Sequence, residues 1–158
     1  STALTRFLRL HVALSNFAMT DIVDARVILE RNSAALAAAN AGDVEQAAIR
    51  APLLEMDSAG IDVERFNDAD TAFHVAIAQA SGNQLVSDMT VAIRASLRQP
   101  ILDAMRQVED WPALARVLQS QHHGIFEAIQ AGDDETAAGL TEAHIRAAFD
   151  ALAGLRSS

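Results

Sequence analysis

The chain of 158 residues has the length of one domain, and 51% of its residues are hydrophobic, which is enough for a sizeable core. Its net charge of −9 disfavours direct binding to a phosphate backbone, and the absence of cysteine excludes disulfides, thiolate zinc sites and cysteine nucleophiles. About a fifth of the residues are alanine, with only 7 glycines and 3 prolines, so the composition favours an all-α domain.

Helical segments separated by short stop signals follow one another along the whole chain. The predicted helices cover residues 4–15, 20–40, 43–58, 62–80, 84–108, 110–130 and 133–155. Thr20 or Asp21 is expected to cap the second helix. Pro52 should disturb the third helix and Pro100 should kink the fifth. No strand-like alternation persists, so we expect a single domain over 1–158, folded as an antiparallel bundle of six or seven helices.

Asp70 and His74 fall on an inward face of the helix predicted over residues 62–80. Asp70 shares that face with Phe66, Phe73 and Ile77, and His74 follows it by four residues, which is one helical turn. A carboxylate and an imidazole at this spacing point the same way.

Two further histidines lie on apolar stripes of the last two helices. His122 shares its stripe with Leu118, Ile125 and Ile129. His144 shares its stripe with Leu140, Ala147 and Ala151. His123 instead falls on a polar face with Gln119. His122 precedes Gly132 by ten residues and His144 follows it by twelve, so an antiparallel helix pair places them within roughly 3 Å of the same height.

Three inward histidines and an inward aspartate are costly to bury without partners. Neutral imidazoles and a carboxylate are typical ligands of zinc, nickel or a similar divalent ion, so we expect Asp70, His74, His122 and His144 to bind a metal. The alternative is a buried hydrogen-bond network of the same residues without metal. No other carboxylate is an obvious general base beside the three histidines.

Several ordered motifs resemble the FCD domain, the effector-binding half of FadR-type regulators in the GntR family of bacterial transcription factors. They begin with the segments 24–30 and 34–38. Asp70-Thr71-Ala72-Phe73-His74, the turn Ser81-Gly82-Asn83, the segment from His122 to Ile129, and Ala143-His144-Ile145 follow in order. The resemblance covers about residues 20–152.

This resemblance implies an all-helical domain in which one Asp and three His hold a metal at the floor of a cavity. Small organic acids bind there in metal-containing members, which dimerise and act through a winged-helix DNA-binding domain placed before the FCD domain. No winged helix precedes residue 1, so we expect this chain to be the effector domain alone, reaching DNA only through that absent N-terminal domain.

Three polar side chains are candidates for contacting the effector. Arg26 lies on the face of Met19 and Ile22 and could bind a ligand carboxylate, although a surface ion pair with Glu30 is the alternative. Arg94 lies level with Asp70 by the same hairpin argument, and Asn83 is either a ligand contact or a helix cap. His11 has no partner motif and receives no function.

Two function classes remain open on this reasoning. The first is a non-catalytic, metal-dependent sensor of a small carboxylate or sugar acid, serving a transcription factor. The second is a small helical metalloenzyme that activates water at the same site. The lack of a paired base favours the sensor, and hence no enzyme. We further expect a cytoplasmic protein without a membrane span, and a homodimer formed by the alanine-rich face of the second helix and the segment around Pro100.

Overall fold

The computed structural model describes residues 2–156. Within them the chain forms eight α-helices and no strand, which confirms the all-helical prediction. The helices are α1 Thr2–Ala13, α2 Met19–Asn40, α3 Asp43–Met56, α4 Val63–Ala80, α5 Gln84–Arg106, α6 Trp111–Gln130, α7 Asp134–Ala151 and α8 Ala153–Arg156. The count exceeds the prediction because the last predicted segment divides at Leu152, which ends α7 and leaves α8 as a single turn.

Polar capping residues mark the start of four helices. In each case a side-chain oxygen accepts a hydrogen bond from a backbone N–H in the first turn, which the helix itself leaves unsatisfied. The capping residues are Asp62, Asn83, Asp110 and Asp133. The expected cap at Thr20 or Asp21 is wrong, because α2 begins after Ala18 without a side-chain cap. Asp21 lies in the first turn instead, where its negative charge interacts favourably with the positive end of the helix dipole.

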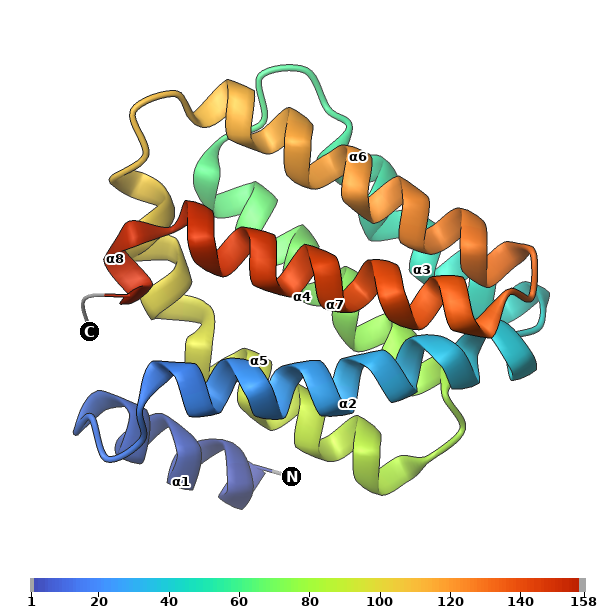
Figure 1. Cartoon of the computed structure of the whole chain (residues 1–158), viewed down its shortest axis with the longest axis horizontal. Coiled ribbons are helices and arrows are strands. Elements are labelled where there is room, and N and C mark those ends of the chain that lie inside the picture. Colours follow the sequence, from blue (N-terminus) through green and yellow to red (C-terminus); the bar gives the residue numbers. More distant parts are fainter. Residues whose placement is uncertain (1, 157–158) are drawn as a thin grey trace.

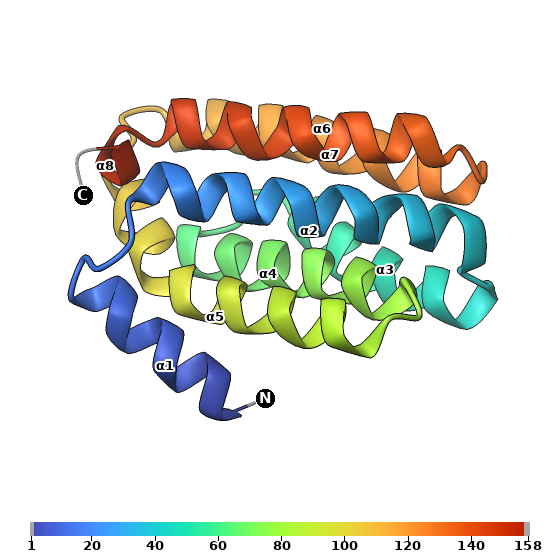
Figure 2. The ribbon, with the colours of Figure 1, turned by 60° about the horizontal axis from the view of Figure 1, so that its bottom comes forward.

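The helices pack as an antiparallel bundle (Figures 1 and 2). α6 and α7 form a hairpin that turns at Gly132, where φ is 70°, and α2 runs antiparallel beside α7. α4 and α5 form a second hairpin, which turns at Gly82, and α4 also packs against α3 and α2. Residues from α2, α4, α6 and α7 therefore meet in one interior.

α5 changes direction along its length, as Figures 1 and 2 show for its yellow part near residue 100. Pro100 lies inside α5 and has no N–H to donate to the preceding turn. Asn67 of α4 donates from Nδ2 to the carbonyl oxygen of Arg98, over 3.1 Å. The change of direction at Pro100 is the expected kink, and the buried amide of Asn67 binds the α5 backbone beside it. Pro52 also lies inside a helix, α3, which continues through it.

The apolar stripe expected on α6 is correct and the one expected on α7 is not. Leu118, Ile125 and Ile129 are buried with His122. On α7, however, Leu140 is 39% exposed, and Ala147 and Ala151 are exposed as well. The buried face of α7 consists of Ala137, Ala138, Thr141, His144, Ile145 and, past its end, Leu152. His144 is inward because it lies where the expected stripe and the observed buried face of α7 overlap.

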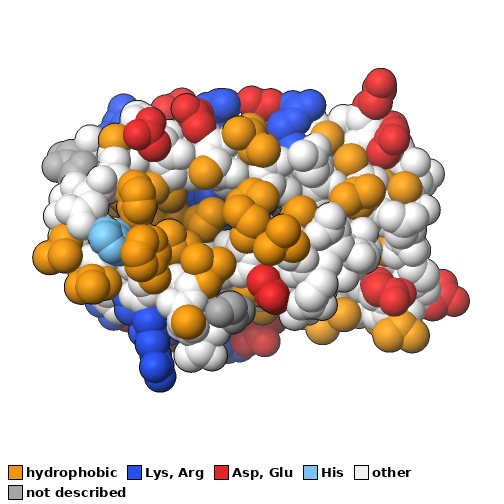
Figure 3. All heavy atoms as spheres, turned by 90° about the horizontal axis from the view of Figure 1, so that it is seen from below, with side chains coloured by type: hydrophobic (Ala, Val, Ile, Leu, Met, Phe, Trp, Pro, Cys, Tyr) orange, Lys and Arg blue, Asp and Glu red, His pale blue; other side chains and the backbone are white. Residues whose placement is uncertain are grey.

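The alanine-rich end of α2 packs partly inside this chain, although Leu36 on it is exposed. Ala34 and Ala37 are fully buried, and Leu97 and Ile101, which flank Pro100, belong to the core. Exposed apolar side chains lie close together in sequence on and after α1, and Figure 3 shows a face on which hydrophobic side chains gather. Those on and after α1 are Phe7, Leu10, Leu14 and Phe17, while others, such as Ile28 and Leu85, lie on α2 and α5. Among residues 2–156, no helix is both long and apolar enough to cross a membrane.

Candidate metal centre

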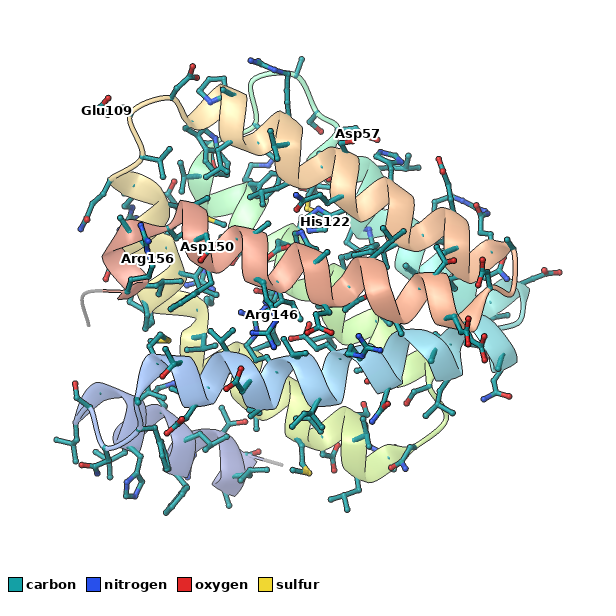
Figure 4. The ribbon with its side chains drawn as sticks, in the orientation of Figure 1. Asp57, Glu109, His122, Arg146, Asp150 and Arg156 are labelled. Atoms are coloured by element: carbon teal, nitrogen blue, oxygen red, sulfur yellow. The ribbon has the colours of Figure 1, made fainter. Side chains whose placement is uncertain are left out.

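Four side chains from three helices converge in the interior of the bundle. Asp70 and His74 come from α4, His122 from α6 and His144 from α7, and all four are buried. Each offers one ligand atom, and these four atoms lie within 4.8 Å of one another. Figure 4 shows His122 inside the bundle, between α6 and α7.

The distances within the cluster are short enough for one metal ion to contact all four ligand atoms. Asp70 Oδ1 lies 2.8 Å from His122 Nε2 and 3.4 Å from His74 Nε2. His122 Nε2 lies 3.1 Å from His144 Nε2. The two histidines of the α6–α7 hairpin therefore face each other, as their similar distances from Gly132 predicted.

An oxygen atom lies beside the outer nitrogen, Nδ1, of each imidazole. These oxygens are Glu30 Oε1 at 2.9 Å from His74, Gln119 Oε1 at 3.1 Å from His122, and Gln121 Oε1 at 2.6 Å from His144. Amide oxygens only accept hydrogen bonds, so a proton on Nδ1 suits the contacts of His122 with Gln119 and of His144 with Gln121. That tautomer directs the Nε2 lone pairs of these two rings inward. Outer hydrogen bonds of this kind are a regular feature of metal-ligating histidines.

The surroundings keep two of the three histidines neutral. Burial lowers the pKa of His122, and burial together with the neighbouring His122 and His74 holds the pKa of His144 well below its usual range. These two rings are therefore neutral at pH 7. Among the described residues, none gives His74 Nε2 a hydrogen bond. The residues present fit a divalent ion such as zinc or nickel, which would attract all four ligand atoms.

Two buried arginines accompany the cluster. Arg94 Nη2 donates to Asp70 Oδ2 over 2.9 Å, and Arg26 Nε donates to Glu30 Oε2 over 3.0 Å. Burial alone would raise the pKa of Asp70, but Arg94 and the imidazoles outweigh it, and this pKa lies well below its ordinary value. The pKa of Glu30 is lowered in the same way, because Arg26 and Arg94 outweigh the effect of burial. Both carboxylates are thus ionised.

A narrow cavity of about 30 Å³ adjoins the cluster. Its polar lining includes Asp70, His144, Arg26 and Arg94, and its apolar lining includes Phe149 and Leu155. A cavity of this size admits water, and it is small beside the pockets of about 300–1,000 Å³ that usually hold small ligands. Both arginines proposed from the sequence therefore line the same space as two of the expected metal ligands.

The other residues considered in the sequence lie elsewhere. Asn83 caps α5, where its Oδ1 accepts from the N–H of Val86, and it lines a separate hollow. His123 is 39% exposed and lies 2.9 Å from a carboxylate oxygen of Asp57 (Figure 4). His11 on α1 contacts Asn16 at the surface.

Three features near the cluster were missed by sequence reasoning. Glu30 lies beside His74, whereas the sequence pattern gave no sign that a second carboxylate approaches the histidines. Its pairing with Arg26 was anticipated, but as a surface ion pair, whereas both side chains are less than 10% exposed. Gln119 was assigned to a polar face and is buried. The i,i+4 spacing of Arg26 and Glu30 was the available signal, since an inward Arg26 carries Glu30 inward with it.

Comparison with known proteins places this chain in a family. The FCD domain family matches residues 21–147. The chain is 30% identical to the HTH-type transcriptional regulator LutR of Bacillus subtilis (strain 168) over 138 residues, which are 84% of this chain and 61% of that protein. It is 32% identical to the galactonate operon transcriptional repressor of Escherichia coli (strain K12) over 120 residues, or 75% of this chain and 51% of the repressor.

A solved structure shares the fold. The structure of E. coli McbR/YncC superposes with a TM-score of 0.75 and 20% sequence identity, covering 85% of this chain and 63% of that one. The chain thus spans between half and two thirds of the length of the proteins it matches. The ordered motifs, the helical bundle and the family match agree, and the chain belongs to the FCD domain family.

Proposed function

We propose that this chain is the metal-dependent, ligand-sensing domain of a GntR-family transcriptional regulator and that its effector is a small organic acid. The observation that carries this proposal is the shared position of the Asp70 cluster and two buried arginines, Arg26 and Arg94, around one cavity. A winged-helix domain on the same regulator would bind DNA, in the bacterial cytoplasm. The net charge of −9 makes this chain itself a poor DNA-binding surface.

The balance of buried charge supports an anionic effector. Two arginines and two carboxylates, Glu30 and Asp70, neutralise one another. A divalent ion held by three neutral imidazoles and Asp70 would leave the cluster near +1 by itself, and the buried assembly including Arg26, Arg94 and Glu30 near +2. In an apolar interior such an excess attracts an anion strongly. The bound ion would also supply coordination positions for carboxylate oxygens.

Arg94 offers an additional donor to such a ligand. Its Nη2 is occupied by Asp70, but none of the described residues accepts a hydrogen bond from the buried Nε. Because the cavity is small, an organic acid requires its lining, which includes Phe149 and Leu155, to move outward. A compact carboxylate demands less movement than a long acyl chain. The name of the E. coli relative refers to galactonate, a sugar acid of this class.

The same contacts argue against a metalloenzyme. A water-activating enzyme needs a base that is free to take a proton. Glu30 lies beside the histidines but is held between Arg26 and His74. Its lowered pKa makes it a weak base. The curated relatives are both named as transcriptional regulators.

We also propose a homodimer, whose interface lies on a different surface from the one expected from the sequence. The exposed Phe7, Leu10, Leu14 and Phe17 form an apolar face on and after α1, and their burial against a second copy would remove it from water. Sedimentation at tens of micromolar is expected to give a dimer. A monomer at that concentration would contradict this part of the proposal.

Ligand titration with and without metal tests the sensor function. The zinc-loaded and chelator-treated chains are each screened by thermal shift against mono-, di- and tricarboxylates and sugar acids. At a hundredfold excess over Kd, a ligand should stabilise the zinc-loaded fold by roughly 2.7 kcal/mol. It should have no such effect after chelation. Equal binding to the metal-free chain would show that the proposed mechanism is wrong.

A further inference from the structure

Gln119 connects the metal cluster to the end of α3. It lies on α6, three residues before His122, and its side chain is buried. Its Nε2 donates to the carbonyl oxygen of Leu53 and to Asp57 Oδ1, each over 2.7 Å. Its Oε1 lies 3.1 Å from His122 Nδ1.

These contacts determine which way the amide faces. A backbone carbonyl such as that of Leu53 accepts hydrogen bonds and never donates, so the neighbouring amide atom must be nitrogen. Both N–H groups of Gln119 are therefore directed at Leu53 and Asp57. The oxygen is left for His122, and an oxygen there requires the imidazole proton to be on Nδ1.

A second acceptor competes for the same proton. His122 Nε2 lies 2.8 Å from Asp70 Oδ1, which is an ideal distance for a hydrogen bond from a protonated Nε2. A neutral imidazole carries only one proton. If the proton moved to Nε2, this nitrogen would lose its free lone pair and would donate a hydrogen bond to Asp70 Oδ1. Both atoms belong to the candidate metal ligands, so this tautomer would block the site.

We propose that Gln119 is a positioning residue that keeps the proton of His122 on Nδ1 and so keeps Nε2 and Asp70 Oδ1 available to a metal ion. Leu53 and Asp57 serve this role by fixing the amide. The inference deepens the proposed function, because it rests on metal binding by the cluster. Gln119 is not itself one of the four ligands, but it controls whether their atoms can bind a metal ion. Because Leu53 and Asp57 fix the amide of Gln119, metal binding also depends on the packing of α3 against α6.

The variant Gln119→Leu tests this role, with His123→Ala as its control. Leucine has a similar volume and no hydrogen-bonding group. His123 Nε2 also contacts Asp57 and lies 3.4 Å from Gln119 Nε2, but its removal leaves both amide bonds of Gln119 intact. Two measurements are made on each chain: the tautomer of His122 by ¹⁵N NMR of the metal-free protein, and zinc affinity by competition with a chromophoric chelator.

The wild-type chain and His123→Ala should show the proton of His122 on Nδ1. In Gln119→Leu the proton should shift to Nε2, and zinc affinity should fall by about ten- to a hundredfold. A proton on Nε2 in the wild-type chain would overturn the inference even if the variant failed to fold. So would a folded Gln119→Leu with unchanged zinc affinity. Absence of zinc binding by the wild-type chain would instead overturn the proposed function, and the NMR tautomer would still report on Gln119.

Discussion

Arg94 and Asp70 form a buried ion pair that uses only one of the two carboxylate oxygens. Arg94 Nη2 donates to Oδ2 over 2.9 Å, whereas Oδ1 faces the histidines. The pair therefore orients Asp70, because rotation of the carboxylate would break the bond to Arg94. It also neutralises the aspartate charge in an interior that would otherwise oppose its ionisation.

Replacing Arg94 should destabilise the metal-free protein severely. Arg94→Met retains an apolar stem but leaves the charge of Asp70 buried without its partner, which typically costs about 3–5 kcal/mol. Arg98→Met is the matched control on the same helix, since Arg98 pairs with Asp68 at the surface and should contribute less than about 1 kcal/mol. Urea unfolding of both variants checks this prediction. Similar losses of unfolding free energy in the two would contradict it.

Metal content should distinguish the inward histidines from their exposed neighbour. His122→Ala and His144→Ala each remove a buried ligand and should lose most of the bound ion, against close to one divalent ion per chain in the wild type. His123→Ala is the control and should keep its metal, because its ring contacts Asp57 outside the cluster. Elemental analysis of the purified chains measures this. Unchanged metal in the first two variants would exclude the assignment.

Helical periodicity and hairpin geometry together predicted where the candidate metal ligands lie. The inward stripes and the distances to Gly132 together placed His122 and His144 opposite each other, and polar capping residues located the starts of four helices. The stripe on α7 was misjudged because alanine is common on both faces of this helix and gives little contrast between them. His144 remained correctly inward despite that error.

The outer contacts were not predictable to the same degree. Glu30 and Gln119 are polar residues that a pattern assigns to the surface, and their burial depends on partners from other helices. Glu30 needs His74 of α4, and Gln119 needs Leu53 of α3. Such partners become visible only when the helices are packed together, because no spacing within α2 or α6 encodes them.

Arg26 should contribute to effector binding without holding the metal. Arg26→Gln alone would leave Glu30 buried without a counter-charge, so the double variant Arg26→Gln, Glu30→Gln removes both charges together. The amide oxygen introduced by Glu30→Gln can take the place of the carboxylate oxygen that lies 2.9 Å from His74 Nδ1. Metal content should stay at the wild-type level, while carboxylate affinity should fall roughly ten- to a hundredfold with the loss of a charge-assisted hydrogen bond.

Elemental analysis and isothermal titration of the zinc-loaded chains measure these two quantities. Carboxylate binding by the double variant as tight as in the wild type would exclude Arg26 as a ligand anchor.

The stability of the metal-free protein should decrease below about pH 6.5. Burial lowers the pKa of His122 and of His144 in the folded chain, whereas both titrate near 6.5 once unfolded. Below that pH the unfolded state binds more protons, so acidification favours unfolding. Each histidine should contribute a slope of up to about 1.4 kcal/mol per pH unit. The depressed pKa values of Asp70 and Glu30 act in the same direction, but only below about pH 4, where unfolded carboxylates take up protons.

Urea unfolding of the chelator-treated chain between pH 7.5 and 5 separates these contributions. Above about pH 6.5 the two histidines add no slope, because both states leave them neutral. The variant His144→Gln should lose about half of the slope found below that pH, since one of the two shifted imidazoles is gone. A free energy of unfolding that stayed constant from pH 7.5 to 5 would mean that these rings are not held neutral by burial. The inward lone pairs on which the metal centre depends would then lack their physical basis.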